Sequence, residues 1–324
     1  MSVAEVFEDL RPLVFSIAYR MLGSVADAED IVQEAFLRYH RVVADGSRIE
    51  SPKAFLSSVT TRLSIDQLRS ARSRREAYVG PWLPEPVLTA PALSGPALPD
   101  PMVAGGWAGP DPAARAEEAD SLSMAFLLLL ERLSPTERAV FLLHDVFDYG
   151  YGEIAGIVGK TEHNCRQLAS RARQHIAEHK PRFDTSRRQR DELAARFFAA
   201  MGEGDMSGLV GLLAADVVVY GDSGGTRPSW PRPIMGRDNV RRLIASLSQQ
   251  IRDMGVTLRR ADVNGQPGAM FYDASGLLIN VICLDIADGA VQAVRSVINP
   301  DKLHHLGPLS DFRSSRGGRA ARDA

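Results

Sequence analysis

The sequence contains only two cysteines, Cys165 and Cys283, which lie far apart and lack the spacing of a metal site. So few cysteines favour a reduced cytosolic compartment over a disulfide-linked secreted fold. The longest apolar run, Met124 to Leu130, is too short to cross a bilayer, and the acidic start MSVAEVFEDL lacks the apolar centre of a signal peptide. We therefore expect a cytoplasmic protein without a membrane partner.

An excess of positive charge is also missing. Lys and Arg number 38 against 40 Asp and Glu, so the formal net charge is -2. Such a chain cannot coat nucleic acid indiscriminately, and any nucleic-acid binding must come from local clusters of basic residues. A hydrophobic content of 45% and a charged content of 24% are typical of globular domains, and 324 residues predict two or three of them.

Proline divides the chain. Nine of its 19 prolines fall between Pro81 and Pro112, where we expect neither helix nor sheet because proline fixes φ and removes amide donors. The predicted units are 1–80, a proline-rich linker at 81–117, 118–180, 187–303 and a disordered tail at 304–324, which is rich in Gly and Arg.

The first two units are predicted to be entirely helical. Apolar residues recur at helical spacing from Val6 to Ala18, and Ser24 precedes a stripe that runs from Ala28 to Phe36. Ser51 followed by Pro52 is a strong helix start. In the second unit, SPTERAVFLLHD begins with the same combination of a serine cap and a proline. Short helices separated by capped turns are therefore expected throughout 1–80 and 118–180.

The third unit changes character. Helices are expected at about 190–203, 206–214 and 236–251, and strand-like segments at VVVYGD, 256–263, 269–273, 277–286 and 290–298. The intervening NGQPG, ASG and DG are turn signals. Helices followed by an antiparallel sheet predict an α+β domain with a curved sheet.

The stretch YGEIAGIVGKTEHNCRQLASRARQHI has the pattern of a helix-turn-helix. Gly159 ends a short helix and Thr161 caps the next, whose apolar face contains Cys165, Ala169 and Ile176. The opposite face gathers Arg and Gln, the residue types that bond base edges bidentately. The alternative interpretation is an amphipathic surface helix with solvated arginines.

Two helices of the first unit carry charge. The helix from Pro52 places Arg62, Asp66 and Arg69 on one face and ends in a basic run. Taken alone, this pattern also fits an intrahelical ion-pair ladder with arginines near the terminal carbonyls. The preceding helix is acidic, which alone fits a solvated surface.

Together these blocks resemble a bacterial extracytoplasmic-function (ECF) sigma factor. The resemblance rests on GSVADAEDIVQEAFLRYHR, SPKAFLSSVTTRLSIDQLRSARSRR and the segment from LERLSPTER to the helix-turn-helix, and it covers about residues 5 to 180. It implies a promoter-recognition subunit of RNA polymerase, with a first domain that binds core polymerase and opens the −10 element and a second that reads the −35 element. Core RNA polymerase and promoter DNA, duplex at −35 and melted at −10, are thus the expected partners.

The resemblance also implies three sets of functional residues. Core polymerase would be contacted by the acidic residues Asp27, Asp30 and Glu34. The −10 element would be held by Thr60, Thr61, Arg62, Asp66 and Arg69, with phosphate contacts from Arg72, Arg74 and Arg75. The −35 duplex would face Glu162, His163, Arg166, Gln167, Ser170 and Arg171.

Three short motifs resemble the SigJ-type ECF subgroup, which carries a fused C-terminal SnoaL-like (NTF2-like) domain. That domain is understood to regulate the sigma factor in cis. The motifs are WLPEP, which is Trp82, Leu83, Pro84, Glu85 and Pro86; part of an Asp-Gly-Gly-Gly-Lys loop, at Asp222, Gly224 and Gly225; and NPDKL, which is Asn299, Pro300, Asp301, Lys302 and Leu303. The loop departs from the subgroup at Ser223 and Thr226. We expect the first and last motifs to help dock the appended domain.

The third unit is not predicted to be an enzyme. Acid–base candidates are Asp216, Tyr220, Asp222 and Asp285, and none forms a His–Asp pair by sequence spacing. No catalytic residue, metal or cofactor is expected, although a cone-shaped sheet leaves a cavity that could hold a small ligand. Two alternatives stay open: a helix-turn-helix regulator that acts without polymerase, and a SnoaL-like enzyme with accessory DNA-binding helices.

Overall fold

The computed structural model describes residues 3–76, 78–90, 119–178, 185–227, 230 and 232–311, without the side chains of 71–76, 90, 250 and 251. These residues form two compact units. The first unit is built from 3–76 and 119–178, and the second from 78–90 and 185–311. The first part of the proline-rich segment therefore belongs to the C-terminal unit.

The first unit begins with three long helices, α1 (Val3–Leu22), α2 (Val25–Ala44) and α3 (Pro52–Glu76). The Ser24 side chain accepts from the Asp27 amide and caps α2, and Ser51 does the same for the Ala54 amide at the start of α3. The predicted stripe on α2 is buried, and all three helices pack against one another. These capped, amphipathic helices form a bundle because each has one apolar face to bury.

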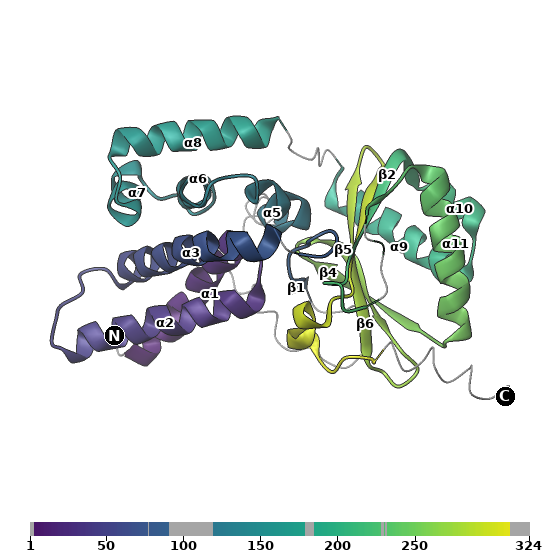
Figure 1. Ribbon diagram of the computed structural model, residues 1–324, viewed down its shortest axis with the longest axis horizontal. Helices are drawn as coiled ribbons and strands as arrows, with labels where there is room; N and C mark the ends of the chain where they lie inside the picture. The colour runs from purple at the N-terminus through teal and green to yellow at the C-terminus, as the bar shows by residue number, and fades with distance from the viewer. Residues whose placement is uncertain are drawn as a thin grey trace. The chain divides into compact units, whose positions relative to one another are not determined.

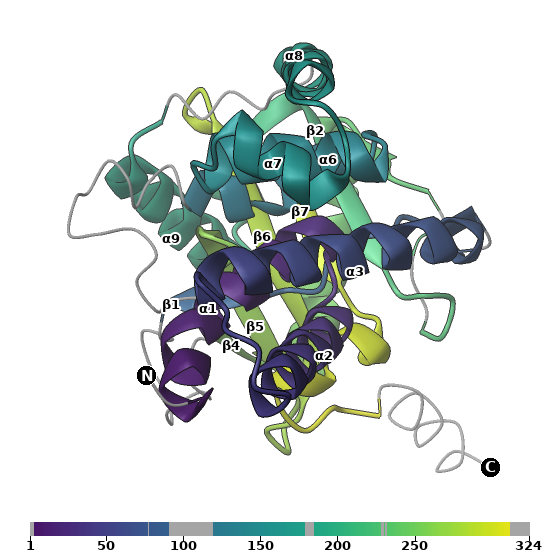
Figure 2. The ribbon, with the colours of Figure 1, turned by 90° about the vertical axis from the view of Figure 1, so that its left-hand side faces the viewer.

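Shorter helices complete the first unit. They are α5 (Met124–Leu130), α6 (Pro135–Phe141), a π-helical segment (Leu142–Val146), α7 (Tyr151–Val158) and α8 (Glu162–Ala177). Figures 1 and 2 show the tiers within this unit: α8 lies over α6 and α7, which lie over α3. Helix α8 thus packs on α6 and α7, and these two helices pack on α3.

Buried Arg138 joins the two groups of helices in the first unit. Its guanidinium donates to the carbonyl oxygens of Leu130 (2.9 Å) and Met21 (2.5 Å) and pairs with Glu131 at 2.8 Å. Burial lowers the pKa of Arg138 to about 9. A buried cation with several partners fixes the position of α6 against the end of α1.

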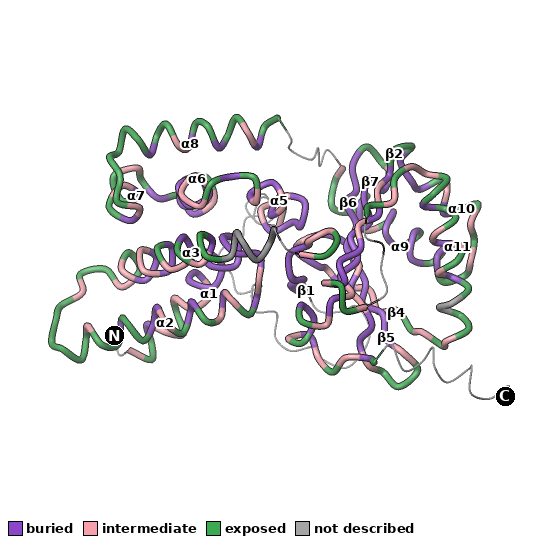
Figure 3. The backbone as a smooth tube through the Cα atoms, in the orientation of Figure 1, coloured by how far each residue is buried: buried purple, intermediate pink, exposed green. Residues whose placement is uncertain are grey.

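The second unit is a seven-stranded sheet covered on one face by helices (Figure 1). Its strands are β1 (Leu88–Ala90), β2 (Leu213–Asp222), β3 (Ile234–Met235), β4 (Thr257–Val263), β5 (Gln266–Tyr272), β6 (Leu278–Ala287) and β7 (Ala290–Val297), in the order β1-β4-β5-β6-β7-β2-β3. The helices are α9 (Arg187–Glu203), α10 (Met206–Val210) and α11 (Arg237–Asp253). Their inner faces and the strands hold the buried residues of this unit (Figure 3).

Three expectations for this unit were wrong in detail. The proline-rich segment contributes a strand, β1, because Leu88–Ala90 lies between prolines and can pair with β4 at the sheet edge. The sheet is mixed, since the first long strand β2 pairs in parallel with the last strand β7. Helix α10 ends at Val210, and the chain enters β2 at Leu213 instead of staying helical to 214.

Part of the predicted disordered tail is ordered. Residues 304–306 form a 3-10 turn, Leu309 bridges to Leu278, and the Ser310 amide donates to the Leu278 carbonyl oxygen at 2.9 Å. These backbone bonds hold 304–311 beside β6, and residues 312–324 lie outside the described residues. Among the described helices, none is both long enough and apolar enough to cross a bilayer.

Candidate functional sites

Helix α8 presents its predicted reading face to solvent. Cys165, Ala169, Ala172 and Ile176 are buried against α6 and α7, and Leu168 is half-buried. The Thr161 side chain accepts from the Asn164 amide and begins the helix, and Gly159 ends α7 with a φ of 65°. All six predicted −35 residues are exposed on the remaining surface: Glu162, His163, Arg166, Gln167, Ser170 and Arg171.

Neighbouring side chains hold this face in place. Arg166 pairs with Glu162 and lies over the Tyr151 ring, 5.3 Å from its centroid. The side chain of Gln167 bonds to His163 at 3.1 Å, and Arg171 reaches Glu137 at 3.4 Å. Because these side chains are exposed or half-buried, each contact stabilises the protein only weakly.

Helix α3 does not expose its predicted −10 residues as a continuous surface. Asp66 and Arg69 are exposed and pair at 3.4 Å, but Thr60 and Thr61 are fully buried at 0% exposure. A buried stripe of small hydroxyl side chains runs along the helix at i, i+3, i+4 and i+7: Ser57, Thr60, Thr61 and Ser64. Thr60 and Thr61 are therefore not accessible to DNA in this arrangement, and their role at the −10 element stays a prediction. The side chains of Arg72, Arg74 and Arg75 lie outside the described residues.

This part of α3 is bonded to the helix-turn-helix. The Ser57 hydroxyl forms a hydrogen bond with the Tyr149 hydroxyl at 2.7 Å, and both side chains are buried. Arg62 donates to the carbonyl oxygens of Gly156 and Ile157, both at 2.8 Å, near the end of α7. The Thr60 and Thr61 hydroxyls are buried without a hydrogen-bond partner among the described residues. In this arrangement Arg62 therefore binds the carbonyl oxygens at the end of α7, and it does not complete an ion-pair ladder along α3.

Helix α2 carries the predicted polymerase-binding residues on its outer surface. Asp30 is exposed, Glu34 pairs with Arg38 at 2.7 Å, and Asp27 accepts from Gln67 at 3.2 Å. Sequence reasoning missed Leu37, which is 51% exposed next to these acids. The sequence pattern that could have identified Leu37 is its position outside the buried apolar stripe from Ala28 to Phe36, since a leucine there must be exposed.

The three SigJ-type motifs come together inside the second unit around Asp222. This carboxylate is fully buried and accepts from the Leu83 amide (2.7 Å), the Lys302 ammonium (2.7 Å) and the Tyr78 hydroxyl. It also accepts from the Gly224 amide at 3.2 Å. We call this cluster the linker anchor: Tyr78, Trp82, Leu83, Asp222, Asn299 and Lys302.

Lys302 is the cation at the centre of the linker anchor. Its ammonium also donates to the Leu83 carbonyl oxygen at 2.5 Å and lies over the rings of Trp82 (4.4 Å) and Tyr78 (4.9 Å). The pKa of Tyr78 is raised, first by burial and then by its bond to Asp222. The Asn299 side chain donates to the Tyr78 hydroxyl at 3.0 Å. A buried ion pair with this many bonds fixes the linker tightly.

The two glycines of the predicted loop let it approach the anchor. Gly224 and Gly225 have φ of 58° and 73°, which side chains other than glycine rarely adopt. A Cβ at Gly224 would collide with the Asn299 side chain, and one at Gly225 would press on Val79. The loop at 223–226 thus closes over the start of the linker.

A second set of bonds continues the anchor along the linker. The Val87 amide donates to Asn264 at 3.0 Å and its carbonyl oxygen accepts from the Asn264 amide at 2.8 Å. His305 donates through Nε2 to the Pro86 carbonyl oxygen at 2.8 Å. Pro84, Glu85 and Leu303 are buried beside them, whereas Asp301 is exposed and Pro300 is half-buried. No local pattern predicts the contacts of Tyr78, Asn264 and His305, because only folding brings these distant segments together.

Comparison with known proteins identifies the family. Family models match for Sigma-70 region 2 over residues 6–74, Sigma-70 region 4 over residues 123–176 and a SnoaL-like domain over residues 194–298. The ECF RNA polymerase sigma factor SigJ of Mycobacterium tuberculosis is 38% identical to this chain over 98% of each protein. The chain belongs to the ECF sigma factors. The predictions of family, of fold class and of a role in transcription initiation are confirmed.

Other relatives agree with this ECF sigma factor assignment. A probable ECF RNA polymerase sigma factor, SigI of the same organism, is 31% identical and matches 91% of this chain and 93% of its own. The crystal structure of SigJ aligns with a TM-score of 0.71 at 37% identity, covering 95% of this chain and 100% of that chain. Helices α1–α3 are therefore the region-2 domain, α5–α8 the region-4 domain, and the second unit contains the SnoaL-like domain.

Proposed function

We propose that this ECF sigma factor initiates transcription from promoters that it reads with α8 and α3, and that its free form is a closed state. In the closed state the region-4 domain covers the part of α3 that reads the −10 element. The SnoaL-like domain regulates the change to an open state by holding the start of the linker. A cytoplasmic location follows from core RNA polymerase as the partner.

The observation that carries the closed state is the contact between α3 and α7. Each helix is about 10 Å across, so α8, which packs on α7, lies within roughly 20 Å of α3. Elements centred near −35 and −10 are separated by roughly 80 Å of B-DNA at about 3.4 Å per base pair. The two reading helices cannot occupy both elements at once in this arrangement, so the region-2 and region-4 domains must separate on the promoter.

The unsatisfied hydroxyls of Thr60 and Thr61 support the same conclusion. A buried hydroxyl without a partner destabilises its surroundings by about 1–3 kcal/mol. This penalty makes the closed state weaker than a permanent domain contact. In the open state the hydroxyls gain water or the melted −10 strand as partners, together with Arg62, Asp66 and Arg69 and the basic run Arg72, Arg74 and Arg75.

The −35 assignment is supported by the exposed face of α8. Arg166 and Gln167 lie in the N-terminal half of the helix, the part with which helix-turn-helix proteins contact base edges. Their partners, Glu162 and His163, are on the same face and are released when the helix enters the groove. Ser170 and Arg171 follow one turn later and suit phosphates.

The polymerase contact is assigned to the outer surface of α2. Asp27, Asp30 and Glu34 supply negative charge that would steer a basic clamp surface. Leu37 adds an exposed apolar side chain beside them, and apolar anchors surrounded by charges are typical of protein interfaces.

Regulation in cis is supported by the path of the chain. Helix α3 ends at Glu76, and Tyr78, two residues later, is already part of the linker anchor. The anchor thus holds the segment that directly follows α3 in the sequence on the SnoaL-like domain. Because residues 78–90 are fixed, less of the linker is free to span the separated domains.

Catalysis by the SnoaL-like domain is not part of this function. Asp222 is engaged in the linker anchor, and Asp285 pairs with Arg295 at 2.6 Å. Tyr220 lies under the Arg295 guanidinium, 4.9 Å from it, and Asp216 is exposed on β2. None of these four lines the pocket described below.

Run-off transcription with core RNA polymerase tests the closed state. In a Ser57→Cys/Tyr149→Cys variant, a short bismaleimide would join α3 to the region-4 domain across the observed contact. We expect the cross-linked protein to lose promoter-specific transcription. Variants that carry only one of the two added cysteines beside the buried native Cys165 and Cys283 should keep it under the same treatment. Full transcription by the cross-linked protein would show that opening is unnecessary. Arg166→Ala/Gln167→Ala should abolish dependence on the −35 sequence without weakening polymerase binding.

A further inference from the structure

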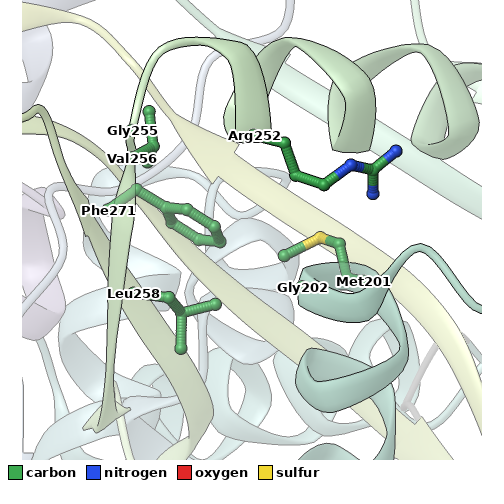
Figure 4. A pocket seen from close by; sticks show the side chains of 7 residues that line it. All are labelled: Met201, Gly202, Arg252, Gly255, Val256, Leu258 and Phe271. Atoms are coloured by element: carbon green, nitrogen blue, oxygen red, sulfur yellow. The ribbon is translucent and has the colours of Figure 1, made fainter.

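The SnoaL-like domain contains a pocket of about 280 Å³ between its helices and its sheet (Figure 4). Met201, near the end of α9, forms one wall, and Leu258 and Phe271, on β4 and β5, form the other. Val256 closes the side before β4. This volume is just below the range of about 300–1,000 Å³ that is usual for ligand sites.

One charged side chain belongs to the lining. Arg252, in the last turn of α11, is exposed, and no carboxylate is among the residues that line the pocket. Its guanidinium donates to the Gln249 side chain at 2.9 Å. It also lies against Gly204, where a Cβ would collide with Nη1. These two contacts position the guanidinium and leave further N–H donors for a ligand, because arginine has five.

We infer that this pocket binds a small apolar carboxylate. The apolar walls would enclose a short aliphatic or aromatic body, and a methionine in the wall adapts to its shape. Arg252 at the rim would pair with the carboxylate, since a planar guanidinium matches a carboxylate in a bidentate contact. A neutral alcohol of the same size would lose this pairing, and a cation would be repelled.

The position of the pocket gives the ligand a route to the linker. Strand β4 carries Leu258 in the pocket wall and, at its other end, Asp262 and Val263, which pair with β1 of the linker. Occupancy that shifts β4 would therefore change how the linker is held. This coupling rests on the proposed regulation of transcription, but the binding does not.

Binding is tested on the full chain with hexanoate, hexan-1-ol and hexylammonium by titration calorimetry. We expect saturable binding of hexanoate about tenfold or more tighter than hexan-1-ol, the difference that a charge-assisted hydrogen bond supplies, and no binding of hexylammonium. Arg252→Gln should remove the preference for the acid over the alcohol, whereas Arg241→Gln, a change at an exposed arginine on the same helix, should leave it intact. Leu258→Trp should block both ligands by filling the pocket, and Met201→Trp provides a second filling variant if the first fails to fold.

Two results would overturn the inference. One is the absence of saturable hexanoate binding up to millimolar concentrations by a folded protein. The other is equal binding of the acid by the wild type and Arg252→Gln, which would mean that Arg252 only caps the helix ends. Transcription measured with and without hexanoate then separates the two proposals: binding without a transcriptional effect would refute the coupling through β4 and leave the site established.

Discussion

Two buried polar regions of this sigma factor are built in opposite ways. In the linker anchor, the Asp222 carboxylate and the Lys302 ammonium are each bonded by several groups from distant segments. Under the region-4 domain, the α3 stripe buries Thr60 and Thr61 with hydroxyls that have no partner among the described residues. Full satisfaction is the mark of a permanent joint, whereas partial satisfaction is tolerable at a surface that spends part of its time exposed.

The difference assigns each contact a part in regulation. In the proposed regulation, the linker anchor keeps residues 78–90 on the SnoaL-like domain. In the same proposal, the contact between α3 and the region-4 domain is the one that opens. A substitution that removes one partner from the linker anchor should therefore destabilise the SnoaL-like domain strongly. A substitution that removes an unpaired buried hydroxyl from α3 should stabilise the closed state.

The largest effect is expected at the anchor. Lys302→Met leaves Asp222 buried without its cation, and breaking a buried ion pair on one side costs about 3–5 kcal/mol. Urea unfolding should show this loss for the SnoaL-like domain, and limited proteolysis should show cleavage between residues 78 and 90. Asp301→Asn, a change at the exposed neighbour, is the control and should do neither. An unchanged urea midpoint for Lys302→Met would mean that the linker anchor does not stabilise the SnoaL-like domain.

A smaller effect of opposite sign is expected on the stripe. Thr61→Val removes an unsatisfied buried hydroxyl, whose penalty is about 1–3 kcal/mol, and should raise the melting temperature of the first unit without DNA. Transcription should fall because the closed state is favoured. The matched control is Ser64→Ala, because the Ser64 hydroxyl already donates to the Thr60 carbonyl oxygen at 2.9 Å and its removal brings no such gain. A lower melting temperature for Thr61→Val would contradict the comparison.

The bond between Tyr149 and Ser57 should have a third, still smaller effect. Removing it with a Ser57→Ala/Tyr149→Phe pair loses about 0.5–1.5 kcal/mol of the closed state, which corresponds to a roughly two- to tenfold larger open population. Promoter transcription should rise by that factor at limiting sigma factor. Arg62→Ala also opens the contact but removes a proposed −10 contact, so its transcription should fall. A rise in both variants would separate Arg62 from promoter reading.

The sequence predicted local structure well because local structure follows from spacing and caps. The buried face of α8, the stripe on α2 and the serine caps are all set by residues within one or two turns. The resemblance also named the three motifs that meet at Asp222. It could not show that Thr60 and Thr61 are buried, because small polar residues on a helix normally indicate a solvated face. Strand β1 was missed because the prolines on either side of it predict a loop. Its partner strand, β4, lies far along the chain, so no local pattern indicates the pairing.

The smallest effect separates the two regions by pH. Burial lowers the pKa of His305 below its ordinary value of about 6.5, and the neighbouring His304 lowers this pKa further. The Pro86 carbonyl oxygen and Glu85 raise it, but by less than burial lowers it. The unfolded chain then takes up a proton before the folded one does. The stability contributed by neutral His305 is therefore complete above about pH 6.5 and is lost as the pH falls through that value toward the folded pKa.

Thermal unfolding should thus show that the SnoaL-like domain becomes less stable between pH 7.5 and pH 5. The loss should be smaller in His305→Gln, because glutamine keeps an N–H donor but does not titrate. The hydrogen bonds described above between α3 and the region-4 domain join hydroxyl, guanidinium and backbone carbonyl groups, so the distance between spin labels on α3 and on α7 should be independent of pH over this range. Equal pH dependence in the wild type and His305→Gln would assign the effect to another group. A pH-dependent closed state would mean that the two regions do not act as separate devices.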